Sequence, residues 1–187
     1  MNVIATELPG LLVVAPRVFR DRRGFFTETY RASRYREAGI DCTFVQDNVS
    51  RSVQGTLRGL HFQVHHPQAK LVQVLAGEIY DVALDLRGGS PTYGRWYGTH
   101  LSDRDFQQLF IPAGFAHGFC VLSPEVLFAY KCSTDYRPDD EGGITWNDPD
   151  LGIDWPLDNP RVSDKDSRLP RLAACNAAQL PRERYRP

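Results

Sequence analysis

Residues 71–84 read Leu71-Val72-Gln73-Val74-Leu75-Ala76-Gly77-Glu78-Ile79-Tyr80-Asp81-Val82-Ala83-Leu84, and this stretch decides the fold class. Two short apolar runs, Leu71–Leu75 and Ile79–Leu84, flank the dipeptide Ala76-Gly77. Runs of this length that are rich in β-branched residues and bounded by a glycine are typical of strands. We therefore predict two strands joined by a tight hairpin turn at Ala76-Gly77.

Comparable runs recur along the chain, separated by Gly, Pro, Asp and Ser. The predicted strands are Leu11–Val14, Phe25–Tyr30, Phe44–Ser50, Thr56–Phe62, Leu71–Leu75, Ile79–Leu84, Trp96–Leu101, Leu109–Ile111, His117–Leu122 and Leu127–Ser133. In the first half only Ala32–Ala38 has a helical pattern, with Gly39 as its stop signal. Many short strands with frequent turns predict an all-β fold, an antiparallel barrel or jelly roll with a few short helices.

Length, charge and cysteine usage limit the kinds of protein this can be. A chain of 187 residues favours one domain, 1–187, that buries its own core. The net charge of −1 argues against binding to nucleic acid or an anionic membrane. No apolar run approaches the ~20 residues needed to span a bilayer, and the first residues lack the features of a signal peptide. Because the chain has four cysteines and no CxxC pair, we expect reduced thiols in a cytoplasmic protein. Residues 182–187 are basic and bounded by proline, and we expect them to form a loose tail.

Two of the five histidines lie in stretches that could carry chemistry. His61 belongs to Leu57-Arg58-Gly59-Leu60-His61-Phe62-Gln63, and a bulge at Gly59 would alter which side chains share a face there. His117 follows Pro112 and Gly114 in the pattern PxGxxH. His65 and His66 are expected in a solvated loop. For any single histidine, a hydrogen-bonded structural role is an alternative to catalysis.

The PxGxxH pattern resembles the second motif of cupin-type jelly rolls. Metal-binding cupins place His-x-His in their first motif, whereas this chain has His61-Phe62-Gln63. Because a divalent metal site needs three or four histidine or carboxylate ligands, the set is incomplete even if Glu78 or Asp81 helps. We expect no metal and no other cofactor, which leaves His61 available as a proton-transfer base.

Nine segments in order resemble the dTDP-4-dehydrorhamnose 3,5-epimerase family. They are Arg23–Glu28, Phe44–Asn48, Leu57–Gln63, Ala69–Val72, Gly77–Val82, Ile111–Phe119, Tyr130-Lys131, Trp146–Asp148 and Ser163–Asp166. The resemblance spans about residues 3–166, the expected core, and leaves 167–187 as a C-terminal tail without a signature. The family implies a cupin-like jelly roll and a dTDP-4-keto-6-deoxy sugar as substrate.

The resemblance also implies catalytic roles for particular residues. His61 matches the base that removes the C3 and C5 protons of dTDP-4-dehydro-6-deoxy-D-glucose, and Asp166 matches its carboxylate partner. Lys70 matches the cation beside the C4 oxyanion. Tyr130 matches the acid that returns a proton to the opposite face.

The family's substrate-binding positions match eleven further residues here. They are Arg23, Phe26, Glu28, Gln46, Asp47, Asn48, Arg58, His117, Tyr136, Glu141 and Lys165. Guanidinium groups suit diphosphate oxygens, and the ring of Tyr136 suits stacking on thymine. A structural role in a turn is the alternative for Asp47.

The family further implies a homodimer that exchanges N-terminal strands, so that Arg23, Phe26 and Glu28 would reach the partner's site. Three alternatives stay open at this point. The chain could invert C3 only, as relatives in antibiotic-sugar pathways do. It could be a metal-dependent cupin enzyme, or a sugar-nucleotide-binding barrel without catalysis.

Overall fold

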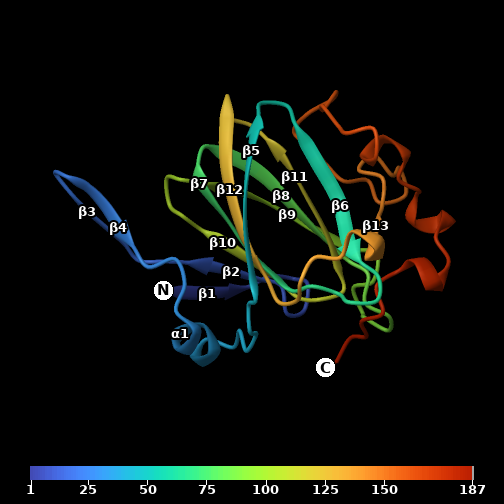
Figure 1. The fold of residues 1–187 in the computed structure, drawn as a ribbon, viewed down its shortest axis with the longest axis horizontal. Coiled ribbons are helices and arrows are strands. Elements are labelled where there is room, and N and C mark those ends of the chain that lie inside the picture. The colour runs from blue at the N-terminus through green and yellow to red at the C-terminus, as the bar shows by residue number, and fades with distance from the viewer. Residues whose placement is uncertain (187) are drawn as a thin grey trace.

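Two antiparallel sheets face each other in the computed structural model, which describes residues 1–186 (Figure 1). The six-stranded sheet has the order β1 (Asn2–Ala5), β2 (Leu12–Ala15), β10 (Gln108–Ile111), β7 (Lys70–Ala76), β12 (Glu125–Cys132), β5 (Gln46–Val53). The five-stranded sheet has the order β13 (Glu141–Gly143), β6 (Leu57–Gln63), β11 (Phe115–Val121), β8 (Glu78–Asp85), β9 (Trp96–Ser102). The prediction of an all-β, cupin-like antiparallel fold is confirmed.

Every one of the ten predicted strands overlaps a strand of the structure, and the predicted helix is α1 (Ala32–Glu37). The sequence prediction missed β1, β13 and the first strand of a separate hairpin, β3 (Val18–Asp21) with β4 (Gly24–Thr27). Four 3₁₀ turns follow, η1 (Pro138–Asp140), η2 (Asp166–Arg168), η3 (Leu172–Ala174) and η4 (Ala177–Gln179). Within the described residues, no helix is long and apolar enough to cross a membrane.

The predicted hairpin at Ala76-Gly77 is wrong, although both of its strands exist. β7 pairs with β10 and β12, whereas β8 pairs with β11 and β9 in the other sheet. Gly77 (φ 91°) instead carries the chain from one sheet to the other, where a Cβ would collide with the Glu125 carbonyl and the Ser123 hydroxyl. The local sequence signals a turn but does not select the partner strand.

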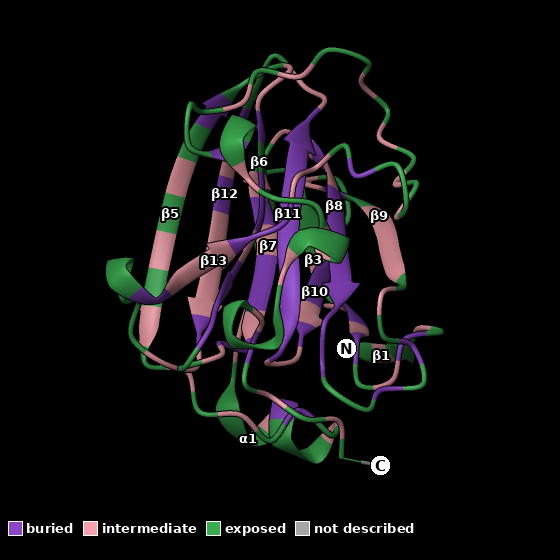
Figure 2. Cartoon of the chain, turned by 90° about the vertical axis from the view of Figure 1, so that its right-hand side faces the viewer, coloured by how far each residue is buried: buried purple, intermediate pink, exposed green. Residues whose placement is uncertain are grey.

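The hydrophobic core fills the space between the sheets. Leu109, Phe119 and Phe128 belong to this cluster, together with inward residues of β7, β8 and β11. β11 is buried along its whole length, whereas the edge strand β5 is mostly exposed or half-buried (Figure 2). The six-stranded sheet therefore ends at β5 in a strand that is in contact with solvent.

The segment that follows β13 covers the outer face of the five-stranded sheet. Leu151, Leu172 and Leu180 pack there against a second buried cluster. The expectation of a loose tail is wrong up to Tyr185: Arg182 N–H donates to the Val64 carbonyl at 2.8 Å, and Tyr185 N–H donates to the Gly88 carbonyl at 3.2 Å. These backbone hydrogen bonds fix residues 182–185 against the barrel. Pro187 lies outside the described residues.

Candidate active site

A bulge in β6 determines how two functional side chains are oriented. His61 lies opposite His117 on β11 and Arg58 lies opposite Phe119, so Gly59 and Leu60 together face the single residue Gly118. The extra residue places Arg58 and His61 on the same face of the sheet, three positions apart. Only glycine fits at 59, because φ is 125° and a Cβ would lie 2.5 Å from the Cα of Gly118.

His61 and Asp166 form the central hydrogen-bonded pair. The ring Nε2 lies 2.7 Å from Asp166 Oδ1, and the backbone N–H of Gly59 donates to the other carboxylate oxygen at 3.3 Å. Burial alone would raise the pKa of Asp166, but these hydrogen bonds and the His61 charge lower it overall. An ionised carboxylate can only accept, so we assign the proton to Nε2 and the free lone pair to Nδ1.

One cavity of about 170 Å³ brings the predicted base, cation and acid together. His61 enters it from β6 of the five-stranded sheet, whereas Lys70 and Tyr130 enter from β7 and β12 of the six-stranded sheet. Lys70 pairs with Cys132 across the β7–β12 ladder, and Cys132 lies two positions after Tyr130 on β12. The side chains of Lys70, Cys132 and Tyr130 therefore all point to the inward face of the six-stranded sheet. The imidazole and the phenol therefore stand on opposite walls.

Burial tunes the two groups on the six-stranded sheet in ways that suit proton chemistry. Burial lowers the pKa of Lys70, because the ammonium is removed from water. Burial raises the pKa of Tyr130, which keeps the phenol protonated and able to donate. Lys70 Nζ makes no hydrogen bond or ion pair within residues 1–186, which leaves it ready for a developing negative charge.

Tyr136 and Glu141 line the same cavity at its open end. The Tyr136 hydroxyl donates to Glu141 at 2.7 Å, and this hydrogen bond raises the pKa of Tyr136 to about 12. Lys165 Nζ also lies 2.8 Å from the Glu141 carboxylate, and His61 Nδ1 lies 3.8 Å from it. Gln46 and Asn48 complete this wall from β5.

A second cavity of about 330 Å³ adjoins the first at His61. Arg58, Lys165 and Asp166 line it, and Arg58 Nε donates to the Ser52 hydroxyl across the gap between β6 and β5 at 3.1 Å. The cationic side chains of Arg58 and Lys165 in this second cavity suit the oxygens of a phosphate group.

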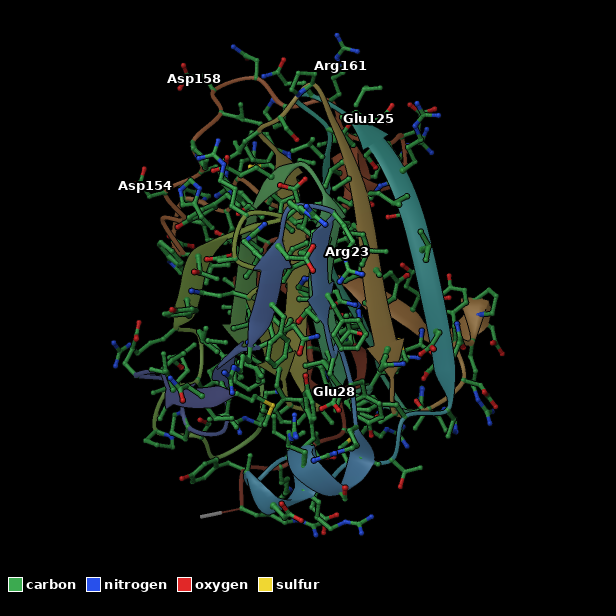
Figure 3. The ribbon with its side chains drawn as sticks, turned by 90° about the vertical axis from the view of Figure 1, so that its left-hand side faces the viewer. Arg23, Glu28, Glu125, Asp154, Asp158 and Arg161 are labelled. Atoms are coloured by element: carbon green, nitrogen blue, oxygen red, sulfur yellow. The ribbon has the colours of Figure 1, made fainter. Side chains whose placement is uncertain are left out.

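Five predicted binding residues lie elsewhere in the described chain. Arg23 and Phe26 are on the projecting β3–β4 hairpin, and Glu28 follows it. Figure 3 shows Arg23 on this arm, in front of the six-stranded sheet, and Glu28 at the base of the arm near α1. Asp47 lies outside the cavity because strand alternation turns it to the outer face, where its carboxylate pairs with Lys131 at 2.9 Å. His117 is buried and faces Asp81 at 2.9 Å rather than lining the cavity.

Gln63, Gln68 and Cys132 also line the cavity and were missed from the sequence. Alternation along β12 could have found Cys132, because it lies two residues after Tyr130. Gln63 occupies the second ligand position of a metal-binding cupin, and its amide is bonded to the Arg137 backbone. Among residues 1–186, no three His, Cys, Asp or Glu side chains come together as a group that could hold a metal ion.

The cupin-like fold and the His61, Lys70 and Tyr130 side chains in one cavity define the class of protein, a cupin-like enzyme that uses general acid–base catalysis. The sequence profile described as dTDP-4-dehydrorhamnose 3,5-epimerase matches residues 5–174. The chain belongs to this family and is an isomerase.

Individual relatives agree with this assignment. A dTDP-4-dehydrorhamnose 3,5-epimerase of Methanothermobacter thermautotrophicus is 52% identical over 166 residues, 87% of this chain and 90% of the relative. The crystal structure of dTDP-6-deoxy-D-glucose-3,5-epimerase from Legionella pneumophila in complex with dTDP-4-keto-L-rhamnose superposes with a TM-score of 0.95 at 49% identity, covering 100% of this chain and 99% of the other. A dTDP-4-dehydrorhamnose 3-epimerase of Streptomyces niveus is 38% identical, covering 97% and 94%.

Proposed function

We propose that this chain inverts C3 and C5 of dTDP-4-dehydro-6-deoxy-D-glucose to give dTDP-4-dehydro-L-rhamnose in the cytoplasm. One observation carries the proposal: His61 and Tyr130 face one cavity from two different sheets, with Lys70 beside Tyr130. Inversion at carbon requires a proton to leave one face and another to arrive at the opposite face. A base and an acid on opposite walls supply both.

The proposed reaction uses the same groups at both carbons. His61 Nδ1 removes the proton beside the C4 ketone, and the imidazolium that forms is stabilised by Asp166 at 2.7 Å and Glu141 at 3.8 Å. The electron pair moves to the ketone oxygen, where Lys70 stabilises the enolate. Tyr130 then donates its proton from the other wall. Before the second carbon reacts, the His61 imidazolium gives its proton to water and the Tyr130 phenolate regains one from water. The same steps then invert that carbon.

The nucleotide would lie toward the open edge of the barrel. Tyr136 offers a half-exposed ring for stacking on thymine, and Gln46, Asn48 and Glu141 offer hydrogen bonds beside it. Arg58 and Lys165, at the adjoining cavity, would bind the diphosphate. We also infer that residues 1–187 form one domain, because the segment after 166 packs on the same barrel.

We propose in addition that two copies form a dimer in which the β3–β4 arm of each reaches the other's cavity. Phe25 and Phe26 on this arm are 53% and 69% exposed, which is costly for large apolar side chains unless a partner covers them. The outer face of β5 exposes Val49 and Val53, and these side chains would contact the partner's arm. The arm would then deliver Arg23, Phe26 and Glu28 in trans.

Mixing two inactive variants tests this arrangement. If the arm acts in trans, a 1:1 mixture of His61→Ala subunits and Phe26→Ala subunits should regain up to about a quarter of the wild-type activity. About half of the dimers are then mixed, and each mixed dimer holds one intact site. A monomer by light scattering, or no recovery after subunit exchange, would reject the exchanged arm.

Turnover in D₂O tests the proposed reaction. After exhaustive chelation, the purified protein should convert dTDP-4-dehydro-6-deoxy-D-glucose into a product with solvent deuterium at both C3 and C5. Deuterium at C3 alone would favour the 3-epimerase alternative. Loss of activity on chelation, restored by iron, manganese or zinc, would favour the metal-dependent cupin enzyme.

A further inference from the structure

A short exposed turn carries two of the groups proposed to bind the nucleotide. This 136–141 turn consists of Tyr136, Arg137, η1 and Glu141, the first residue of β13. Residues 136–139 are exposed, so little apolar burial holds them in place. A turn of this kind is mobile unless hydrogen bonds fix it, and a mobile Tyr136 would lose stacking affinity through the entropy of ordering it.

Gln63 provides the first of two fixations. Its side chain is 3% exposed, donates from Nε2 to the Arg137 carbonyl at 3.0 Å and accepts the Arg137 N–H at Oε1 at 2.9 Å. The backbone N–H and C=O of one residue, Arg137, are thereby both satisfied by one side chain, as an adjacent strand would satisfy them. Tyr136, the preceding residue, has its own N–H bonded to Gln46 Oε1 at 2.8 Å.

Asp140 provides the second fixation at the other end of the turn. Its buried carboxylate accepts the backbone N–H of His65 at 2.9 Å and that of His66 at 2.9 Å, and it lies 2.6 Å and 3.2 Å from their Nδ1 atoms. Its carbonyl also accepts the Val64 N–H at 2.9 Å. The two histidines expected in a solvated loop are therefore bonded to the residue that precedes Glu141.

From these contacts we infer that Gln63 and Asp140 are positioning residues that hold the 136–141 turn against β6, so that Tyr136 and Glu141 are preorganised for the nucleotide. The inference rests on the proposed function and deepens it, because it says how the nucleotide end of the site is built. It also gives Gln63 a purpose at the position where a metal-binding cupin has a ligand: its amide is committed to the Arg137 backbone.

A double-mutant cycle on dTDP binding tests the inference without turnover. Gln63→Met removes both hydrogen bonds at similar volume and should weaken dTDP binding about tenfold, while Tyr136→Ala weakens it by at least as much. If Gln63 acts through Tyr136, the double variant should bind at most about threefold more weakly than Tyr136→Ala alone, because neighbouring residues of one network are not additive. Calorimetry with dTDP gives all four dissociation constants.

Gln54→Met is a matched control, because Gln54 also bonds a backbone carbonyl, that of Leu122 at 2.7 Å, but lies outside the site. It should bind dTDP as the wild type does. Additive effects in the cycle, or Gln63→Met binding within twofold of wild type, would overturn the inference. If Gln63→Met does not fold, Asp140→Asn takes its place in the same cycle with the same criteria. Wild-type protein that fails to bind dTDP would instead reject the proposed nucleotide site.

Discussion

Replacing Asp166 by Asn removes the charge from the His61–Asp166 pair and, because the amide NH₂ cannot accept, also the hydrogen bond that the Gly59 N–H donates to the second carboxylate oxygen. The amide oxygen can still accept from Nε2–H, so the ring orientation at 2.7 Å can persist while the charge is lost. At an effective dielectric constant of about 20, opposite charges about 4 Å apart attract by about 4 kcal/mol. This attraction exists only once His61 is protonated, which is the state that forms as the proton leaves carbon.

Because Glu141 remains 3.8 Å from His61, part of the loss is compensated. We expect Asp166→Asn to lower kcat by about 30- to 1000-fold, equivalent to about 2–4 kcal/mol, with KM changed less than about threefold. The assay is deuterium incorporation at C3 and C5 followed by NMR, and both positions should slow together. Asp164→Asn, an exposed neighbour, is the control. A kcat for Asp166→Asn within threefold of wild type would refute the reasoning.

Three further variants test other parts of the site. Lys70→Met should lower kcat by about 100- to 1000-fold and yet raise Tm, because burial lowers the pKa of Lys70 and so makes its ammonium unfavourable in the fold. Because the pKa of Lys70 is lower in the folded state, the unfolded chain binds more protons at Lys70 as pH rises toward 10.5. The wild type should therefore gain stability over this pH range, and the difference in Tm between Lys70→Met and wild type should shrink. A difference in Tm that stays constant with pH would contradict this. Gly59→Ala should destabilise the fold by about 2–4 kcal/mol in urea titrations, through its strained φ and the clash with Gly118, and a loss below about 1 kcal/mol would mean that the bulge relaxes. His61→Ala should bind dTDP with a dissociation constant within about threefold of wild type by calorimetry, while its turnover falls at least about 1000-fold. Turnover retained by this variant would show that His61 is not the base.

The strands could be predicted where their own side chains carry the signal. The buried positions of Leu127–Ser133 and Ile79–Leu84 are apolar except for Asp81, and both runs overlap observed strands, β12 and β8. β13, by contrast, is Glu141-Gly142-Gly143, which has no strand propensity and is extended because it pairs with β6. Gly77 shows the same limit, since a turn signal does not specify which sheet the next strand joins.

The site could be predicted in part. The resemblance supplied His61, Asp166, Lys70 and Tyr130. The opposition of His61 to Lys70 and Tyr130 across one cavity depends on which strands fall in which sheet. Alternation could have predicted that Asp47 does not line this cavity, because Gln46 and Asn48 on either side of it do.

Long-range hydrogen bonds set the other limit on prediction from sequence. The bonding of His65 and His66 to Asp140 joins residues 75 and 74 positions apart, and no local pattern encodes such a pairing. The same holds for Gln63 and the Arg137 backbone, 74 positions apart.

The Tyr130→Phe variant in D₂O tests most directly whether two opposed groups carry out the inversion. With His61 intact and the opposite-face donor removed, recovered 4-keto sugar nucleotide should gain deuterium at the carbons beside the ketone, while inverted product forms at least about tenfold more slowly than with wild type. Inverted product at the wild-type rate and with the wild-type deuterium pattern would show that Tyr130 is not the second proton carrier.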